Sequence, residues 1–290
     1  MFKGSYVALA MPFNEDGSVD FEAYERLVDF QLENGTDGLV PCGCTGEAAT
    51  LSHEEQKQCI RFVVERVAGR AKVLAGTGSN NTREALELTK FAAEAGADGA
   101  LLITPYYNKP TPAGQIAHYE KVARAVPDLP IMLYNVPSRT GINIQPATVA
   151  TLSRVDNIRA IKEAAGSVDQ VSQILSLCDI TVLSGDDSLT LPMMAVGATG
   201  VVSVAANVAP GPVAELCRRA LAGDFAGARE IHYRLMPLFK ALFIETNPIP
   251  VKAALARMGL IRNVLRLPLV PLSAEKAPEL EQVLRDLGLL

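Results

Sequence analysis

The sequence predicts a (β/α)8 barrel, an α/β TIM barrel, with a C-terminal helical extension. A short apolar run, a turn of small residues and an amphipathic stretch follow one another along the chain, and the apolar run occurs eight times. Strands that alternate with helices predict parallel pairing and right-handed crossovers. The length of 290 residues suits a barrel, which takes roughly 250 residues as one domain.

The strands are expected in the apolar runs, which are mostly continuous, as strands covered on both faces should be. These runs are 6–13, 38–43, 72–78, 99–105, 130–136, 158–164, 180–185 and 200–207. A doubly wound open sheet is the alternative architecture. No G-x-G-x-x-G motif follows the first run, and "GTGSNN" after the third is too short a match, so the barrel is favoured.

The helices are expected where apolar residues recur at helical spacing between capping signals. One helix begins after a cap at Asp20 and ends at Gly35, and another ends at Gly96. Residues 212–290 contain four helical stretches, more than an eighth barrel helix needs. We therefore divide the chain into 1–211, with the barrel strands and the active site, and 212–290, with the last barrel helix and the extension.

Composition excludes several classes of function. The net charge is −5 with no basic stripe, so we expect no nucleic-acid partner, and no apolar stretch approaches the length of a membrane span. The apolar run near the N-terminus is interpreted as part of the folded structure and not as a signal peptide. Five scattered cysteines and three distant histidines predict no disulfide framework and no metal site. A reducing, cytoplasmic location is expected.

Lys162 is the residue whose expected position in the barrel bears most directly on function. Alternate side chains of a strand share a face, so Ile158, Ala160 and Lys162 are expected to point into the barrel, with Lys162 at its C-terminal end. Barrel active sites lie at that end. A buried lysine has a lowered pKa and can attack a ketone to form a Schiff base. Alternatively, Lys162 extends to water or pairs with a carboxylate.

Other side chains are expected near this lysine. Met132 and Tyr134 share one face of their strand, and Val40, Cys42 and Cys44 share one face of theirs. Tyr134 could shuttle protons, although a lone tyrosine is often only a core aromatic. Likewise, "CGCTGE" is either an anion-binding nest of backbone N–H groups or a simple turn.

Two further segments are open to a functional and a structural interpretation. Arg139 taken alone is more often a solvated surface charge. The "SGDDS" segment suggests a metal pair at Asp186 and Asp187, but a helix N-terminus with Ser188 is favoured, because acids there meet the positive end of the helix dipole.

The segments "GCTGEAATLSHEE", "AGTGSNNTREA", "TPYYNKPT", "LYNVPSRTG", "IKEAAG", "LSGDDS" and "ETNPIPVK" occur in this order. Through them the whole chain resembles the dihydrodipicolinate synthase family, in the wider group that also holds N-acetylneuraminate lyase. The resemblance implies a cofactor-free lyase that condenses pyruvate with aspartate semialdehyde on the route to diaminopimelate and lysine. It also implies a homotetramer built as a dimer of dimers.

The resemblance also implies roles for individual residues. The Schiff-base lysine matches Lys162, and the proton-transfer tyrosine matches Tyr134. The tyrosine that reaches in from a neighbouring subunit matches Tyr107. The residues expected to bind substrate are Thr45 and Gly185, with Val202 through its carbonyl, for pyruvate, and Arg139 for the carboxylate of the aldehyde.

One departure from the family pattern concerns the proton relay. The motif usually reads G-T-T-G-E, and here a thiol at Cys44 replaces the first threonine hydroxyl, which links the two tyrosines. A thiol is a weaker donor and acceptor. The efficiency of the relay is therefore in question, but Schiff-base formation is not.

A second set of matches is a possible lysine effector site, formed by His53, Asn80, Glu84 and Tyr106. Ala48 and Gln56 depart from the serine and histidine common there. His53 also has a structural interpretation, because Ser52 and Glu55 form a capping box that places it in an exposed first turn.

Two other functions remain as alternatives. One is an N-acetylneuraminate lyase or 2-keto-3-deoxy sugar acid aldolase, against which Arg139 argues, because sugar-cleaving relatives usually lack it. The other is a pyruvate-binding paralogue without turnover, which the substituted Cys44 would allow.

Overall fold

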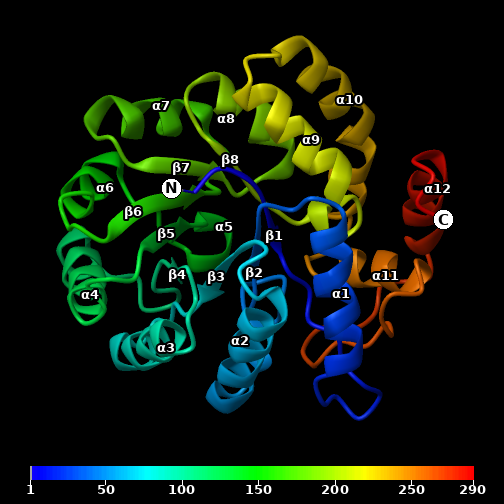
Figure 1. Ribbon diagram of the computed structural model, residues 1–290, viewed down its shortest axis with the longest axis horizontal. Coiled ribbons are helices and arrows are strands. Elements are labelled where there is room, and N and C mark those ends of the chain that lie inside the picture. Colours follow the sequence, from blue (N-terminus) through cyan, green and yellow to red (C-terminus); the bar gives the residue numbers. More distant parts are fainter. Residues whose placement is uncertain (1) are drawn as a thin grey trace.

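The predicted barrel is confirmed. The computed structural model describes residues 2–290, and its eight parallel strands close into a ring in chain order, with β1 paired to both β2 and β8 (Figure 1). The strands are β1 (Gly4–Ala8), β2 (Gly38–Val40), β3 (Lys72–Gly76), β4 (Gly99–Ile103), β5 (Ile131–Asn135), β6 (Ile158–Glu163), β7 (Thr181–Ser184) and β8 (Gly200–Ser203). Seven of them lie within a predicted run, whereas β1 begins two residues before its run of 6–13. Several of the runs continue past the strand into the loop that follows it.

Helices surround the ring of strands in Figure 1. They are α1 (Phe21–Glu33), α2 (His53–Val67), α3 (Thr82–Glu94), α4 (Pro112–Arg124), α5 (Pro137–Thr140), α6 (Pro146–Leu152), α7 (Val168–Leu177), α8 (Thr190–Ala195) and α9 (Pro210–Leu221). Short 3-10 helices are η1 (Ala48–Thr50), η2 (Asp187–Leu189) and η3 (Ala205–Asn207). The caps at Asp20 and the Ser52–Glu55 capping box are present as predicted.

The C-terminal segment forms a helical layer outside the barrel. It contains α10 (Phe225–Ala241), α11 (Ile249–Arg257) and α12 (Ala277–Asp286). Helix α9 packs on β1, α10 packs on α9, and α12 packs on α10 and α11, at the outer edge of Figure 1. Among residues 2–290, no helix combines the length and apolar character that a membrane span requires.

The core has two layers. The interior of the barrel is filled by one cluster of side chains, and a larger cluster lies between the strands and the helices. The interior cluster comprises Phe2, Tyr6, Ala8, Val40, Leu74, Leu101, Met132, Tyr134, Val136, Ala160, Leu183 and Val202, with Cys44, Ile103 and Ala164 packed against it.

The prediction that Ile158 faces the interior is wrong. Ile131 pairs with Ile158, but Met132 pairs with Ala160, so the register between β5 and β6 shifts by one residue. The extra residue, Arg159, is exposed. Ile158 therefore packs in the outer cluster, whereas Ala160 packs in the interior. A bulge inserts one extra residue into a strand, so the side chains before it point to the opposite face from the one that simple alternation predicts.

The prediction that Cys42 shares a face with Val40 and Cys44 is also wrong. β2 ends at Val40, and Cys42 has a left-handed backbone with φ of 57°. Strand alternation stops there. The Cys42 thiol turns to the outer cluster, where it lies 3.7 Å from the carbonyl oxygen of Gln56. Cys44 packs against the interior cluster.

Candidate active site

Lys162 lies inside the barrel at the carboxyl end of β6. It pairs in register with Tyr134 on β5 and Leu183 on β7, both of which belong to the interior cluster. Only 5% of its surface is exposed. This burial lowers the pKa of Lys162 from 10.5 to about 8. A measurable fraction of neutral amine is therefore present near neutral pH, as nucleophilic attack on a carbonyl requires.

Tyr134 lies directly beside the lysine. The Nζ atom of Lys162 is 4.1 Å from the centroid of the Tyr134 ring. Burial, reinforced by the neighbouring Cys44, raises the pKa of Tyr134 well above 10. The phenol is therefore protonated at neutral pH, and its hydroxyl group can donate one hydrogen bond and accept another.

Gly185 leaves room for the lysine side chain. It follows β7, and a Cβ atom added there would lie 2.9 Å from Cε of Lys162 and 2.7 Å from Cβ of Ala164. A larger residue would displace the lysine. Val202 on β8 is fully buried in the same interior cluster.

Thr45 lies in the turn that follows β2 and is 2% exposed. Its Oγ1 atom accepts a hydrogen bond of 3.0 Å from the side-chain amide of Asn247. Because the oxygen is already an acceptor, the hydroxyl hydrogen is free to be donated to an anionic ligand.

Arg139 belongs to the short helix α5, which directly follows β5. Its Nη2 atom donates to the backbone carbonyl of Asn247 over 2.7 Å. The sequence reasoning gave Asn247 no role, although it lies in the "ETNPIPVK" segment. It contacts both Thr45 and Arg139, and its own Oδ1 atom is buried with no hydrogen-bond partner among residues 2–290.

A cavity of about 500 Å³ opens beside this group. Cys44, Tyr134, Arg139 and Asn247 contribute to its wall. Lys162 and Thr45 are not among the lining residues. The cavity therefore approaches the lysine from the side of Tyr134 and Cys44.

The four residues of the possible effector site also come together. His53, Glu84 and Tyr106 line the same cavity, and the His53 ring lies 3.8 Å from the Glu84 carboxylate. Asn80 donates to the backbone carbonyl of Tyr106 over 3.2 Å. His53 is the first residue of α2, as the capping box predicted, so its two interpretations are compatible.

Tyr107 is not brought to Lys162 within this chain. It is 88% exposed and has φ of 70°, on the loop between β4 and α4. The exposed position of Tyr107 is open to contact from outside the chain.

Asp187 is a residue whose position the sequence reasoning did not anticipate. Asp186 caps η2 as expected, but Asp187 is 3% exposed and accepts hydrogen bonds from Ser203 and from the backbone of Val204 and Ala205. It ties the end of β7 to the end of β8. No cluster of His, Cys, Asp or Glu suited to a metal ion occurs among residues 2–290.

The model of the dihydrodipicolinate synthetase family matches residues 1–287. The chain belongs to this family. It is 54% identical over 293 residues to the 4-hydroxy-tetrahydrodipicolinate synthase of Syntrophobacter fumaroxidans, with 100% of both chains covered. Family members of known structure have nearly the same fold. The dihydrodipicolinate synthase from Aquifex aeolicus superposes with a TM-score of 0.97 at 53% identity, over 99% of each chain.

A third family member is the chloride-inhibited dihydrodipicolinate synthase from Acinetobacter baumannii, which was solved in complex with pyruvate. It superposes with a TM-score of 0.98 at 44% identity, over 100% of each chain.

Proposed function

We propose that the chain condenses pyruvate with aspartate semialdehyde to give 4-hydroxy-tetrahydrodipicolinate, a step of diaminopimelate and lysine biosynthesis. The observation that carries the proposal is Lys162, a buried lysine of lowered pKa at the active end of a barrel of this family. The full-length similarity to synthases, including one solved with pyruvate, supports the same substrates.

The reaction begins with covalent catalysis by Lys162. The neutral amine attacks the ketone carbon of pyruvate, and water leaves to give an iminium ion. The cation withdraws electrons and acidifies the methyl group. Tyr134 passes its hydroxyl proton into the relay and accepts the methyl proton, which leaves an enamine. Splitting one difficult step into easier ones is the advantage of the covalent intermediate. Because the pKa of Tyr134 is raised, its hydroxyl holds a proton at rest, and the relay has to remove that proton before Tyr134 can accept the methyl proton.

Substrate binding is assigned to the groups around the lysine. In this proposal, the backbone N–H and free hydroxyl hydrogen of Thr45 hold the pyruvate carboxylate. Arg139 holds the carboxylate of aspartate semialdehyde, because a planar guanidinium can bind two carboxylate oxygens together. The enamine adds to the aldehyde, and the amino group of the substrate then closes the ring and releases Lys162.

The alternatives differ from this proposal in measurable ways. A sugar-acid aldolase would consume a keto-deoxy sugar acid, and a non-catalytic paralogue would bind pyruvate without turnover. Arg139, which lines the cavity, favours an acceptor with its own carboxylate. An assay with pyruvate and aspartate semialdehyde, coupled to a reductase, separates the three.

The decisive experiment is borohydride trapping. Pyruvate with reductant should attach a reduced three-carbon acid to one residue, and peptide mapping should find it at Lys162. Labelling elsewhere, or no labelling in a folded protein, would refute the mechanism.

The proposal includes assembly into a homotetramer and regulation by lysine. The exposure of Tyr107 supports a shared site, in which the tyrosine of one copy completes the relay of another. The convergence of His53, Glu84 and Tyr106 on one cavity supports lysine binding. Initial rates measured with and without lysine test the regulatory part, and sedimentation measures the assembly.

A further inference from the structure

A buried ion pair lies behind the turn that carries Cys44 and Thr45. The Nζ atom of Lys252 on α11 is 2.5 Å from Oε1 of Glu47, and the two side chains are 0% and 1% exposed. The ammonium group also lies 4.3 Å from the centroid of the Phe13 ring. Burying two charges is costly, so the pair depends on close geometry and further hydrogen bonds.

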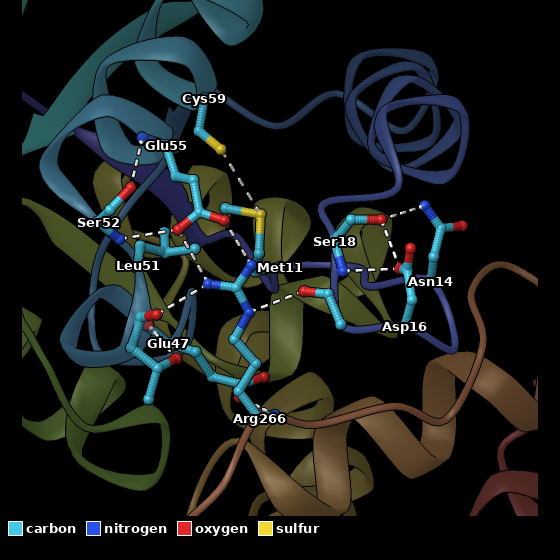
Figure 2. Close-up of polar contacts among 12 residues, drawn as sticks. Met11, Asn14, Asp16, Ser18, Glu47, Leu51, Ser52, Glu55, Cys59 and Arg266 are labelled. Atoms are coloured by element: carbon cyan, nitrogen blue, oxygen red, sulfur yellow. Dashed lines mark hydrogen bonds and ion pairs between the residues drawn. The ribbon is translucent and has the colours of Figure 1, made fainter.

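Arg266 supplies the further contacts. Its backbone N–H donates to the second oxygen of Glu47 over 3.1 Å, so both carboxylate oxygens are engaged. Figure 2 shows its guanidinium pointing toward Glu55, to which it donates two hydrogen bonds of 3.0 and 2.5 Å. It also donates to the backbone carbonyls of Gly17 and Thr50. Arg266 thus joins the C-terminal segment to the start of α2.

The backbone at Glu47 is left-handed, with φ of 48° and ψ of 36°. This conformation is unfavourable for a residue with a side chain and persists where surrounding contacts impose it. Here the Glu47 N–H closes the turn by donating to the Cys44 carbonyl over 3.1 Å. The turn is also tight against the residue that follows β1, because a Cβ atom at Gly46 would lie 3.1 Å from the Leu9 carbonyl.

The turn is held at two points by one C-terminal segment. Asn247 contacts Thr45 in its middle, and Lys252 contacts Glu47 at its end. Neither contact touches the reacting atoms at Lys162. Both contacts are made to the turn that carries Thr45.

We infer that Glu47, Lys252 and Arg266 are positioning residues for residues 43–47, the turn to which pyruvate binding is assigned. The inference rests on the proposed function for its kinetic consequences. Their role is to hold a strained backbone in one conformation, so that the pyruvate carboxylate meets preorganised donors. Preorganisation of this kind affects substrate binding even where the reacting groups are unchanged.

Lys252→Met tests the inference. The KM for pyruvate should rise by about tenfold or more, while kcat at saturating pyruvate falls by less than about threefold, because Lys162 and Tyr134 are unchanged. A residue that only supports folding would lower the amount of active protein and leave KM unchanged, and that result would overturn the inference. Lys57→Met is the matched control, since Lys57 pairs with Glu54 on the surface of α2.

A second variant separates an effect on positioning from an effect of misfolding. Removing one partner of a buried pair leaves an uncompensated charge, whereas Glu47→Gln with Lys252→Met removes both charges and keeps a carbonyl to accept the Arg266 N–H. This double variant should fold and show the same rise in KM for pyruvate. A folded double variant with the wild-type KM would also overturn the inference.

Crystal structures separate the inference from the proposed function. In Lys252→Met or the double variant, Thr45 should be displaced relative to Lys162, whether or not the wild type turns over aspartate semialdehyde. An unmoved turn refutes the positioning role. Failure of the wild type to trap pyruvate, by contrast, refutes the proposed function.

Discussion

The Nζ atom of Lys162 lies 4.1 Å from the centroid of the Tyr134 ring, inside the carboxyl end of the barrel. The two residues pair in register on β6 and β5, so their side chains leave the sheet on the same face. The amine that is proposed to form the Schiff base therefore lies next to the phenol that is proposed to move the proton.

The rate of Schiff-base formation should depend on pH through Lys162. Its pKa is lowered to about 8. Below pH 8, the fraction of neutral amine therefore rises about tenfold for each unit of increasing pH, and above pH 8 it levels off. Single-turnover trapping of pyruvate between pH 6 and 9 should follow this curve. A rate independent of pH across the range would show that deprotonation of Lys162 does not control attack.

Lys162→Met should abolish trapping and stabilise the fold. The pKa of Lys162 is about 8 in the folded protein and 10.5 when solvated, so the unfolded chain binds more protons between these values and stability rises with pH there. Below pH 8 the buried cation costs up to about 3 kcal/mol, which the methionine removes. Denaturant unfolding at pH 7 measures the gain, and a less stable variant would contradict it.

Cys44→Thr should keep or raise kcat, and Cys44→Val should lower it by at least about tenfold. Cys44 packs against the interior cluster that contains Tyr134. A hydroxyl at this position is a better proton donor and acceptor than a thiol, whereas an isopropyl group is neither. Equal rates for the wild type and the valine variant would show that the relay does not run through this atom.

Asn247→Ala should raise the KM for pyruvate by roughly fivefold, which corresponds to the loss of one hydrogen bond of about 1 kcal/mol. The lost bond is the one from the Asn247 amide to Oγ1 of Thr45, whereas the contact of Arg139 is to the backbone and remains. Steady-state kinetics with each substrate varied measure the effect. Asn34→Ala, which removes an exposed amide contact, is the control.

Complementation between two inactive variants tests the shared site. Lys162→Ala and Tyr107→Ala should each be nearly inactive alone. If Tyr107 acts across a subunit interface, mixed assemblies contain sites with an intact lysine and an intact tyrosine from different copies, and activity returns after subunit exchange. No recovery in assemblies shown to be mixed would refute the shared site.

The sequence by itself determined the elements of the barrel and the direction of its central residues. Eight apolar runs, helix caps and glycine stops are local signals, so they could be read without the fold. The two-residue period of a strand was enough to place Lys162 and Tyr134 in the interior, where they lie. The same period placed Ile158 and Cys42 on the wrong face. A bulge interrupts the alternation at Ile158, and a left-handed backbone interrupts it at Cys42.

Only the tertiary structure decided what holds the candidate site together. Asn247 meets Thr45, and Lys252 meets Glu47, across separations of 202 and 205 residues. Asp187 likewise joins the end of β7 to the segment after β8, through hydrogen bonds from the backbone of Val204 and Ala205. No periodic pattern encodes such contacts, because they form only when the barrel closes and the C-terminal layer packs against it.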